Sequence, residues 1–186
     1  KAKNLGLALF GQADYALTEK LSLTLGLRYD YENKKLAIRG EYLREPNPPV
    51  IILADTSAEN NFSAFSPKLA LSYTLKENQL LYLSYSRGFR TGGLTQLGSD
   101  PSQQPLFSYD PEFSHNFEAG WKNTWFKNKI RLNLAAFVTK VSQAQVPTLV
   151  LPDAITVIQN AGTLMSKGFE MELNARPLKG LELQYN

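Results

Sequence analysis

The sequence predicts an all-β fold, an antiparallel meander of about eight long strands. Three observations predict it. Apolar and polar residues alternate with a period of two over most of the chain. Short turns and long excursions follow one another in strict alternation between these runs. No segment carries a convincing helical pattern. The 186 residues are enough for one domain with a sizeable core.

The first half of the chain shows the alternation most plainly. In "KLSLTLGLRYDYE", leucines and then tyrosines occupy every second position, with polar residues or glycine between them. The same pattern holds in the runs on either side, and a fourth begins with "LYLSY". These four expected strands cover 5–17, 20–32, 65–75 and a run that starts at Leu81.

The second half repeats the pattern four more times. In "IRLNLAAFVTK", the isoleucine and the leucines alternate with arginine and asparagine. In "MSKGFEMELN", apolar residues alternate with glycine, glutamates and asparagine. The expected strands are 116–126, 130–141, 163–176 and a run from 181 onward.

The connections fall into two classes that predict two different ends. The short turns are 18–20, 76–79, 127–129 and 177–180, and the long excursions are 33–62, 91–115 and 142–162. A meander with tight turns at one end and long loops at the other is typical of an outer-membrane barrel.

Alternation alone does not separate a membrane barrel from a soluble sandwich, because both place one apolar face opposite one polar face. Strand length favours the barrel, since several runs reach ten or more residues, as a tilted bilayer crossing requires. Aromatic residues also gather near both strand ends, at Tyr15, Tyr73, Trp125 and Phe126 beside short turns and at Tyr29, Tyr31 and Phe89 beside long loops. Arg87 and Lys167 fall on the predicted lipid face, near loop ends where a long side chain can reach the interface.

Composition excludes several kinds of chemistry. The chain has no cysteine and one histidine, so disulfides, thiolate metal sites and cysteine nucleophiles are excluded. The net charge is +3 with no basic run, which argues against a nucleic-acid partner. No positioned nucleophile or metal-ligand spacing appears, so we expect no enzyme, no metal site and no cofactor.

Three ordered motifs carry a resemblance to a known family. They are "YLSYSRGFRTGG" at 82–93, "YDPEFSHNFEAGWKNTWFKNKIRLNLAAFVTKVSQAQV" at 109–146 and "NAGTLMSKGFEMELNARPLKGLEL" at 160–183. With them, the second half of the chain resembles the C-terminal barrel region of TonB-dependent outer-membrane receptors of the siderophore-receptor type. The matching positions are Asp110, Pro111, Glu112, Glu118, Gly120, Lys122, Asn160, Ala161, Gly162, Gly168, Glu170 and Glu172.

The resemblance implies a 22-stranded barrel with a plugged lumen, of which residues 1–186 are a part that lacks the plug domain and the remaining strands. It also implies a ferric siderophore or another bulky solute as ligand, with haem, cobalamin or an oligosaccharide left open. Iron would then be present only as part of the transported complex. The implied partners are the TonB complex, acting through the plug, and outer-membrane lipid, and the implied location is the outer membrane of a Gram-negative bacterium. Two alternatives remain: a small eight-stranded outer-membrane protein, whose first and last strands pair, and a soluble all-β ligand-binding module.

Candidate site residues fall into a loop group and a wall group. Arg87 and Arg90 either meet an anionic ligand at the barrel mouth or pair with carboxylates at its rim. Loop residues with stacking or hydrogen-bonding side chains either line a substrate vestibule or pack the loops, and they are Phe107, Tyr109, Gln143 and Gln145. A salt-bridged wall facing water or the plug is expected from Arg28, Lys68, Glu118, Lys122, Arg131, Glu170, Glu172 and Arg176.

Two further motifs have simple interpretations. "GFRTGG" lacks the Lys-Ser/Thr of a phosphate-binding loop and no helix follows it, so its glycines are expected to relieve crowding where a strand bends into its loop. His115 is expected to be a solvated loop residue, and it would be the candidate ligand if the substrate were haem.

Overall fold

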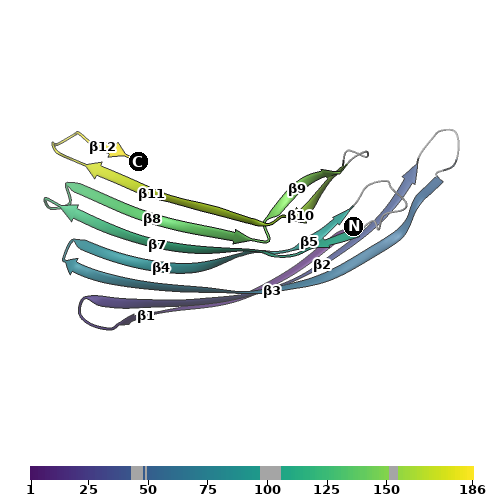
Figure 1. Ribbon diagram of the computed structural model, residues 1–186, viewed down its shortest axis with the longest axis horizontal. Coiled ribbons are helices and arrows are strands. Elements are labelled where there is room, and N and C mark those ends of the chain that lie inside the picture. Colours follow the sequence, from purple (N-terminus) through teal and green to yellow (C-terminus); the bar gives the residue numbers. More distant parts are fainter. Residues whose placement is uncertain (43–47, 49, 97–105, 151–154) are drawn as a thin grey trace.

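A computed structural model describes the chain except for residues 43–47, 49, 97–105 and 151–154. Its main element is one antiparallel sheet of eight strands in the order β1-β2-β3-β4-β7-β8-β11-β12 (Figure 1). These strands are β1 (Ala2–Ala16), β2 (Leu21–Tyr42), β3 (Val50–Lys76), β4 (Gln79–Arg90), β7 (Glu112–Trp125), β8 (Ile130–Ser142), β11 (Thr163–Ala175) and β12 (Leu183–Tyr185). Two hairpins complete the fold, β5 (Gly93–Gln96) with β6 (Leu106–Tyr109), and β9 (Gln145–Val150) with β10 (Ile155–Asn160).

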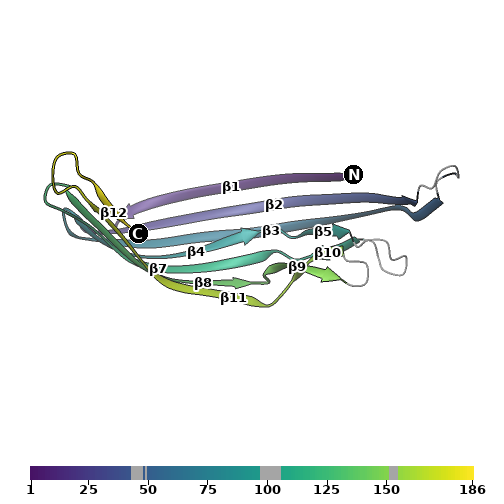
Figure 2. The same cartoon turned by 90° about the horizontal axis from the view of Figure 1, so that it is seen from above.

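The eight predicted strands and their meander order are confirmed. The described residues contain no helix, so none of them forms a helix long and apolar enough to cross a membrane. The tight turns lie together at one end of the sheet and the two hairpins at the other, as Figures 1 and 2 show. The two classes of connection therefore mark two physical ends of the molecule.

The long excursions were predicted to be loops, and this is wrong for much of their length. β2 and β3 stay paired well beyond the predicted strand ends, with Leu36 opposite Ala58. Asn33 donates hydrogen bonds to Glu59 and Asn61 across the strands, and Lys35 forms a 2.8 Å ion pair with Glu59. This extension is held by polar side chains, so an apolar alternation did not reveal it.

The two other excursions also contain strands. Each holds one hairpin, β5–β6 or β9–β10, and β7 begins four residues earlier than predicted, at Glu112 rather than 116. The β5–β6 hairpin contacts β2, β3 and β10, and so lies between the extended β2–β3 pair and the β9–β10 hairpin.

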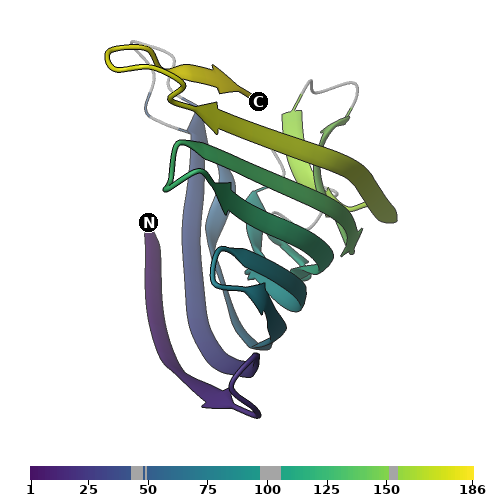
Figure 3. The same ribbon diagram turned by 90° about the vertical axis from the view of Figure 1, so that its left-hand side faces the viewer.

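The sheet curls across its width, as Figure 3 shows, and its two faces differ in chemistry. Cross-strand partners share a face, so the register sets the odd-numbered leucines of β1 to β4 beside Phe117, Val138 and Phe169 on one face. Many of these side chains are exposed, Leu9 to 77% and Phe169 to 66%. Among the described residues the buried apolar side chains are few and lie at the loop end: Phe62, Ala64, Ala144 and Val157.

This arrangement bears on the two alternatives. A soluble module needs a second layer over its apolar face, and the described residues supply none. A closed eight-stranded barrel needs β1 to pair with β12, whereas these strands are the two edges of the described sheet. The open sheet with an exposed apolar face matches a portion of a larger membrane barrel.

Candidate functional site

The polar face of the sheet carries a hydrogen-bonded cluster centred on Tyr82. On β7, Glu118, Gly120 and Lys122 alternate onto this face, and Tyr82 of β4 is the cross-strand partner of Gly120. A Cβ atom at Gly120 would collide with the Tyr82 ring, so the glycine lets the ring lie flat across β7. There the Tyr82 hydroxyl donates to Glu118, and Lys122 Nζ lies 5.2 Å from the ring centroid.

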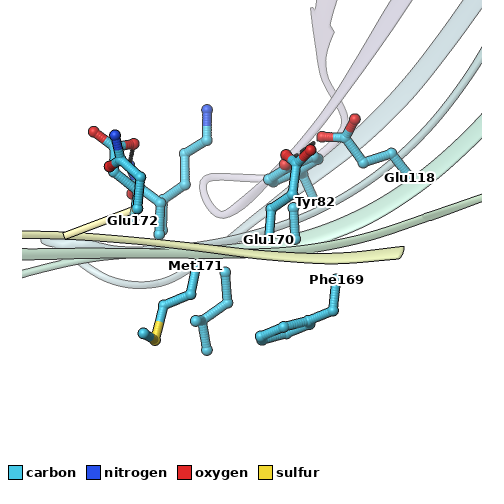
Figure 4. Close-up of a pocket in the computed structure, with 11 residues that line it drawn as sticks. Tyr82, Glu118, Phe169, Glu170, Met171 and Glu172 are labelled. Carbon is cyan, nitrogen blue, oxygen red and sulfur yellow. Dashed lines mark hydrogen bonds between the residues drawn. The ribbon is translucent and has the colours of Figure 1, made fainter. Parts of the chain in front are cut away.

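Two further glutamates face the same space from β11. Glu172 accepts hydrogen bonds from the side-chain amides of Asn133 and Asn174, each at 2.9 Å. Glu170 has no hydrogen bond or ion pair with another described residue. In Figure 4 these glutamates and Glu118 lie on one side of the sheet, and Phe169 and Met171 point to the other. The residues border an open hollow of about 620 Å³.

The eight wall residues were predicted to form a salt-bridged surface, but most of their described partners are of another kind. Arg28 forms its ion pair with Asp30 at 2.7 Å, and Arg176 pairs with Glu182 at 2.9 Å. The wall glutamates take tyrosine and asparagine donors, and no described contact pairs them directly with wall cations. The wall is therefore mainly a hydrogen-bonded surface, on which Lys122 and Arg131 act on Glu172, and Lys68 on Asp14, through their charges alone. Their role toward whatever faces the wall stays a prediction.

The base of the loops is organised by the buried side chain of Gln145, which is 8% exposed. Its Nε2 donates to the carbonyl oxygens of Thr91 at 2.8 Å and Asp110 at 3.1 Å, and its backbone N–H donates to Glu112 Oε2 at 2.7 Å. One side chain thus ties β9 to the ends of both segments that flank the β5–β6 hairpin. This geometry uses the Gln145 amide for loop packing, and its contact with a ligand stays a prediction.

Asn160, at the end of β10, makes a second set of bonds to the same point. Its Nδ2 donates to the carbonyls of Asp110 at 2.9 Å and Gln143 at 2.8 Å, and its Oδ1 accepts from the Asp110 N–H at 2.6 Å. The asparagine therefore pairs with Asp110 as a neighbouring strand would. Gly162 follows at φ +57°, a conformation that suits glycine, and reverses the chain into β11.

The other loop candidates lie at different places. Tyr109 packs its ring against Gly93, where a Cβ would collide with it, so this glycine relieves crowding as predicted. Gln143 is exposed at φ 55°, and Arg90 is exposed at the end of β4. Phe107 lies in β6 opposite Thr95, and its side chain falls outside the described residues. Ligand contacts by these residues stay predictions.

Arg87 lies on the apolar face, as the alternation predicts. Its guanidinium carbon lies 4.0 Å from the centre of the Phe113 ring, and Nη1 donates to the Phe65 carbonyl at 3.3 Å. No described carboxylate pairs with it, and this position does not favour contact with a ligand inside the mouth. His115 is opposite Arg87 in the register and is half-buried, so it is not a solvated loop residue, and its Nδ1 lies 2.9 Å from the Tyr85 hydroxyl.

Sequence reasoning missed the structural importance of Tyr82, Glu112 and Asn160. A glycine opposite an aromatic residue on a polar face could have indicated the first, but it requires the strand register. The other two act through partners far away in the sequence. Among the described residues no group of three or more histidine, aspartate or glutamate side chains is placed to hold a metal ion.

Comparisons with known proteins agree with this geometry. A family model described as TonB dependent receptor-like, beta-barrel matches residues 1–186. The ferric-pyoverdine 358 receptor of Pseudomonas putida is 26% identical over 179 residues, which cover 92% of this chain and 19% of that protein. The metal-pseudopaline receptor CntO of Pseudomonas aeruginosa (strain UCBPP-PA14) is 25% identical over 178 residues, covering 95% and 23%.

A solved structure shows the same fold. The ferric yersiniabactin uptake receptor FyuA from Yersinia pestis superposes with a TM-score of 0.78 at 20% identity, covering 98% of this chain and 26% of that one. The chain belongs to the TonB-dependent receptor-like β-barrel family, whose members here are receptors and not enzymes. It spans about a fifth of the length of the curated relatives that it matches.

Proposed function

We propose that this chain forms part of the wall and the extracellular loops of an outer-membrane receptor that takes up a ferric siderophore or a similar metal complex. The observation that carries the proposal is the pairing of an exposed apolar sheet face with a polar face that is topped at one end by two linked hairpins. An apolar outer band suits lipid, a polar inner face suits a wet lumen, and long loops at one end suit ligand capture. The named relatives, receptors for ferric pyoverdine and metal-pseudopaline, support the substrate class.

The location that goes with this function is the outer membrane of a Gram-negative bacterium. The tight turns would face the periplasm and the hairpins the exterior, since barrels of this kind have short periplasmic turns and long outer loops. Energy would come from the TonB complex, acting through a plug domain inside the barrel. The differential affinity of the ligand for two loop and plug arrangements would then drive capture and release.

The polar face would serve as the surface against which that plug rests. Glu170 carries a negative charge without a described partner, and Glu118 is held in place by Tyr82. Basic side chains of a plug would complete such a surface, because charges on a partly dehydrated face need opposite charges or donors. At the loop end, Arg90 is exposed and can meet the oxyanions of a ferric siderophore.

The test is uptake of radioactive iron by cells that make the receptor containing these residues, with a strain lacking it for comparison. Cells with and without a functional TonB protein are given ferric pyoverdine, ferric yersiniabactin or ferric citrate. Uptake of at least one complex that requires both the receptor and TonB is expected. Receptor protein that fractionates with the outer membrane but gives no TonB-dependent uptake of any metal complex would overturn the substrate class.

A further inference from the structure

On the loop side of the apolar face, basic residues lie on neighbouring strands, with the paired Phe89 and Phe113 one step farther out on β4 and β7. Arg87 of β4, His115 of β7 and Lys140 of β8 are successive cross-strand partners, and Lys167 of β11 is the partner of Val138, one step nearer the tight turns. We call Arg87, Lys140 and Lys167 the outer basic row. Neighbouring strands lie about 4.8 Å apart, so the row extends over roughly 15 Å of the outer surface.

The row borders the apolar band, which is formed by the outward-facing apolar side chains of β1 to β4, β7, β8 and β11. On the side of the tight turns, the next residues on this face are Tyr85, Phe117, Val138 and Phe169, and the last three are 55%, 41% and 66% exposed. Acyl chains that cover this band would place their headgroups at the level of the row. Barrels carry aromatic side chains at the membrane interface, so the row and the Phe89–Phe113 pair beyond it lie at the boundary between hydrocarbon and headgroups on the loop side.

The described contacts of the row include no carboxylate. Arg87 contacts the Phe113 ring and the Phe65 carbonyl, and its Nε is buried without a hydrogen-bond partner. Lys140 and Lys167 are exposed and have no ion pair with a described residue. The nearby glutamates of β7 occupy positions that alternate onto the opposite face, where Glu112 binds the Gln145 N–H and Glu118 binds Tyr82.

Simple extension of the side chains into water does not account for this arrangement. A lysine can carry its charge past the edge of an apolar surface. Arg87, however, is held against the sheet by an aromatic ring and a backbone carbonyl, and one of its donors stays unpaired. Uncompensated cations at the edge of a hydrocarbon layer are stabilised by an anion at the same depth.

We propose that the outer basic row is a binding site for the phosphate groups of an anionic lipid in the outer leaflet, with the acyl chains of the lipid lying on the apolar band. The guanidinium of Arg87 keeps N–H donors that the Phe65 carbonyl does not use and that suit a phosphate, and the two lysines add mobile charges. The inference rests on the membrane location in the proposed function. It assigns the site to lipid and not to the transported ligand, which would enter on the other face.

The experiment uses the complete purified receptor in a neutral detergent, with native mass spectrometry to measure lipid binding. The probes are diphosphoryl lipid A, the same lipid with its phosphates removed, and inorganic phosphate. The test variant is Arg87→Gln, Lys140→Gln, Lys167→Gln. The matched control is Lys76→Gln, Lys127→Gln, Lys129→Gln, which removes the same charge at the tight-turn end.

The triple variant is expected to bind diphosphoryl lipid A roughly 100-fold more weakly, since each basic residue near an anionic surface contributes about fivefold. The control variant is expected to bind like the wild type, and the dephosphorylated lipid is expected to bind the wild type poorly. If the triple variant fails to fold, the exposed Lys167→Gln alone and the two lipid forms on the wild type still test the site.

Equal binding by the triple variant and the wild type would overturn the proposal, as would equal binding of the two lipid forms. Competition by inorganic phosphate at the same concentration as lipid would also overturn it, because the site would then recognise free phosphate. The result is separable from the transport test. A receptor that shows phosphate-dependent lipid binding without iron uptake contradicts only the proposed substrate, and one that transports iron with no lipid preference contradicts only the lipid site.

Discussion

Replacing Gln145 by leucine tests whether one side chain fixes the loop base. The substitution removes the Nε2 donors from the carbonyls of Thr91 and Asp110 and leaves the backbone bond to Glu112 in place. A net intramolecular hydrogen bond contributes about 0.5–1.5 kcal/mol, and a buried carbonyl left unpaired costs about 1–3 kcal/mol. The third contact, to the Arg90 carbonyl, is 3.5 Å long and adds little.

The expected cost is therefore about 2 kcal/mol, confined to the attachment of the β5–β6 hairpin. At 1.36 kcal/mol per tenfold change, local opening becomes roughly 30-fold more frequent. Hydrogen exchange of the intact receptor measures it, with the amides of β5 and β6 exchanging faster and those in the middle of β7 unchanged. Gln159→Leu is the matched control, because Gln159 is exposed on the neighbouring strand and its side chain has no described hydrogen bond.

Two outcomes would contradict the reasoning behind this prediction. Unchanged exchange in β5 and β6 would mean that the two carbonyls find water as readily as they find Gln145. Faster exchange over the whole sheet would mean that the residue supports the wall and not the loop base.

Three further predictions concern other parts of the sheet. Gly120→Val should displace the Tyr82 ring, break its hydrogen bond to Glu118 and destabilise the barrel by about 1–3 kcal/mol. Ala119→Val, on the exposed outer face, is the control and should have little effect. Calorimetry of both variants checks this difference. In the β11–β12 turn, the hydrogen bond from Arg176, and then its charge, lower the pKa of Glu182 below its ordinary value of 4.5. Because the pKa is lowered in the folded state, ionised Glu182 stabilises the turn above pH 4.5, and this stabilisation is lost as the pH falls through the folded-state pKa. A carboxyl titration of the Arg176→Gln variant should show the pKa of Glu182 returning toward 4.5. Gly162→Val should loosen the start of β11, because φ +57° is strained for a β-branched residue. Faster amide hydrogen exchange at residues 163–166 would show this, and unchanged exchange there would mean that the backbone adapts.

The strands could be predicted from the sequence because lipid and lumen impose a period of two on every crossing. Leu21 to Leu27 and Ile130 to Leu134 show it without ambiguity. The upper part of the β2–β3 hairpin could not be predicted in this way, because its cross-strand bonds join polar residues such as Asn33 and Glu59. Above the apolar band neither face needs to be hydrophobic, so the pattern ends before the strands do.

The loop base was beyond sequence reasoning for a different reason. Gln145 bonds to Glu112, Thr91 and Asp110, which are 33, 54 and 35 residues away. No local pattern records such partners, and a glutamine in a loop resembles a ligand-binding residue as much as a structural one. Only the fold, which brings the ends of β4, β7 and β9 together, separates the two roles.

Several residues of the family motifs share one structural role at the base of the loops. Asp110, Glu112 and Asn160 all lie at strand ends beside the loop base. The side chains of Glu112 and Asn160 bond there to backbone groups, including the N–H and carbonyl of Asp110. A strand that leaves a barrel wall loses its neighbours and leaves N–H and carbonyl groups that need partners. Side-chain amides and carboxylates at fixed positions supply them, so these motif positions support the loops. If the chain serves the receptor proposed above, substrate specificity is expected from the hairpins beyond this base, and the two related receptors are named for different metal complexes.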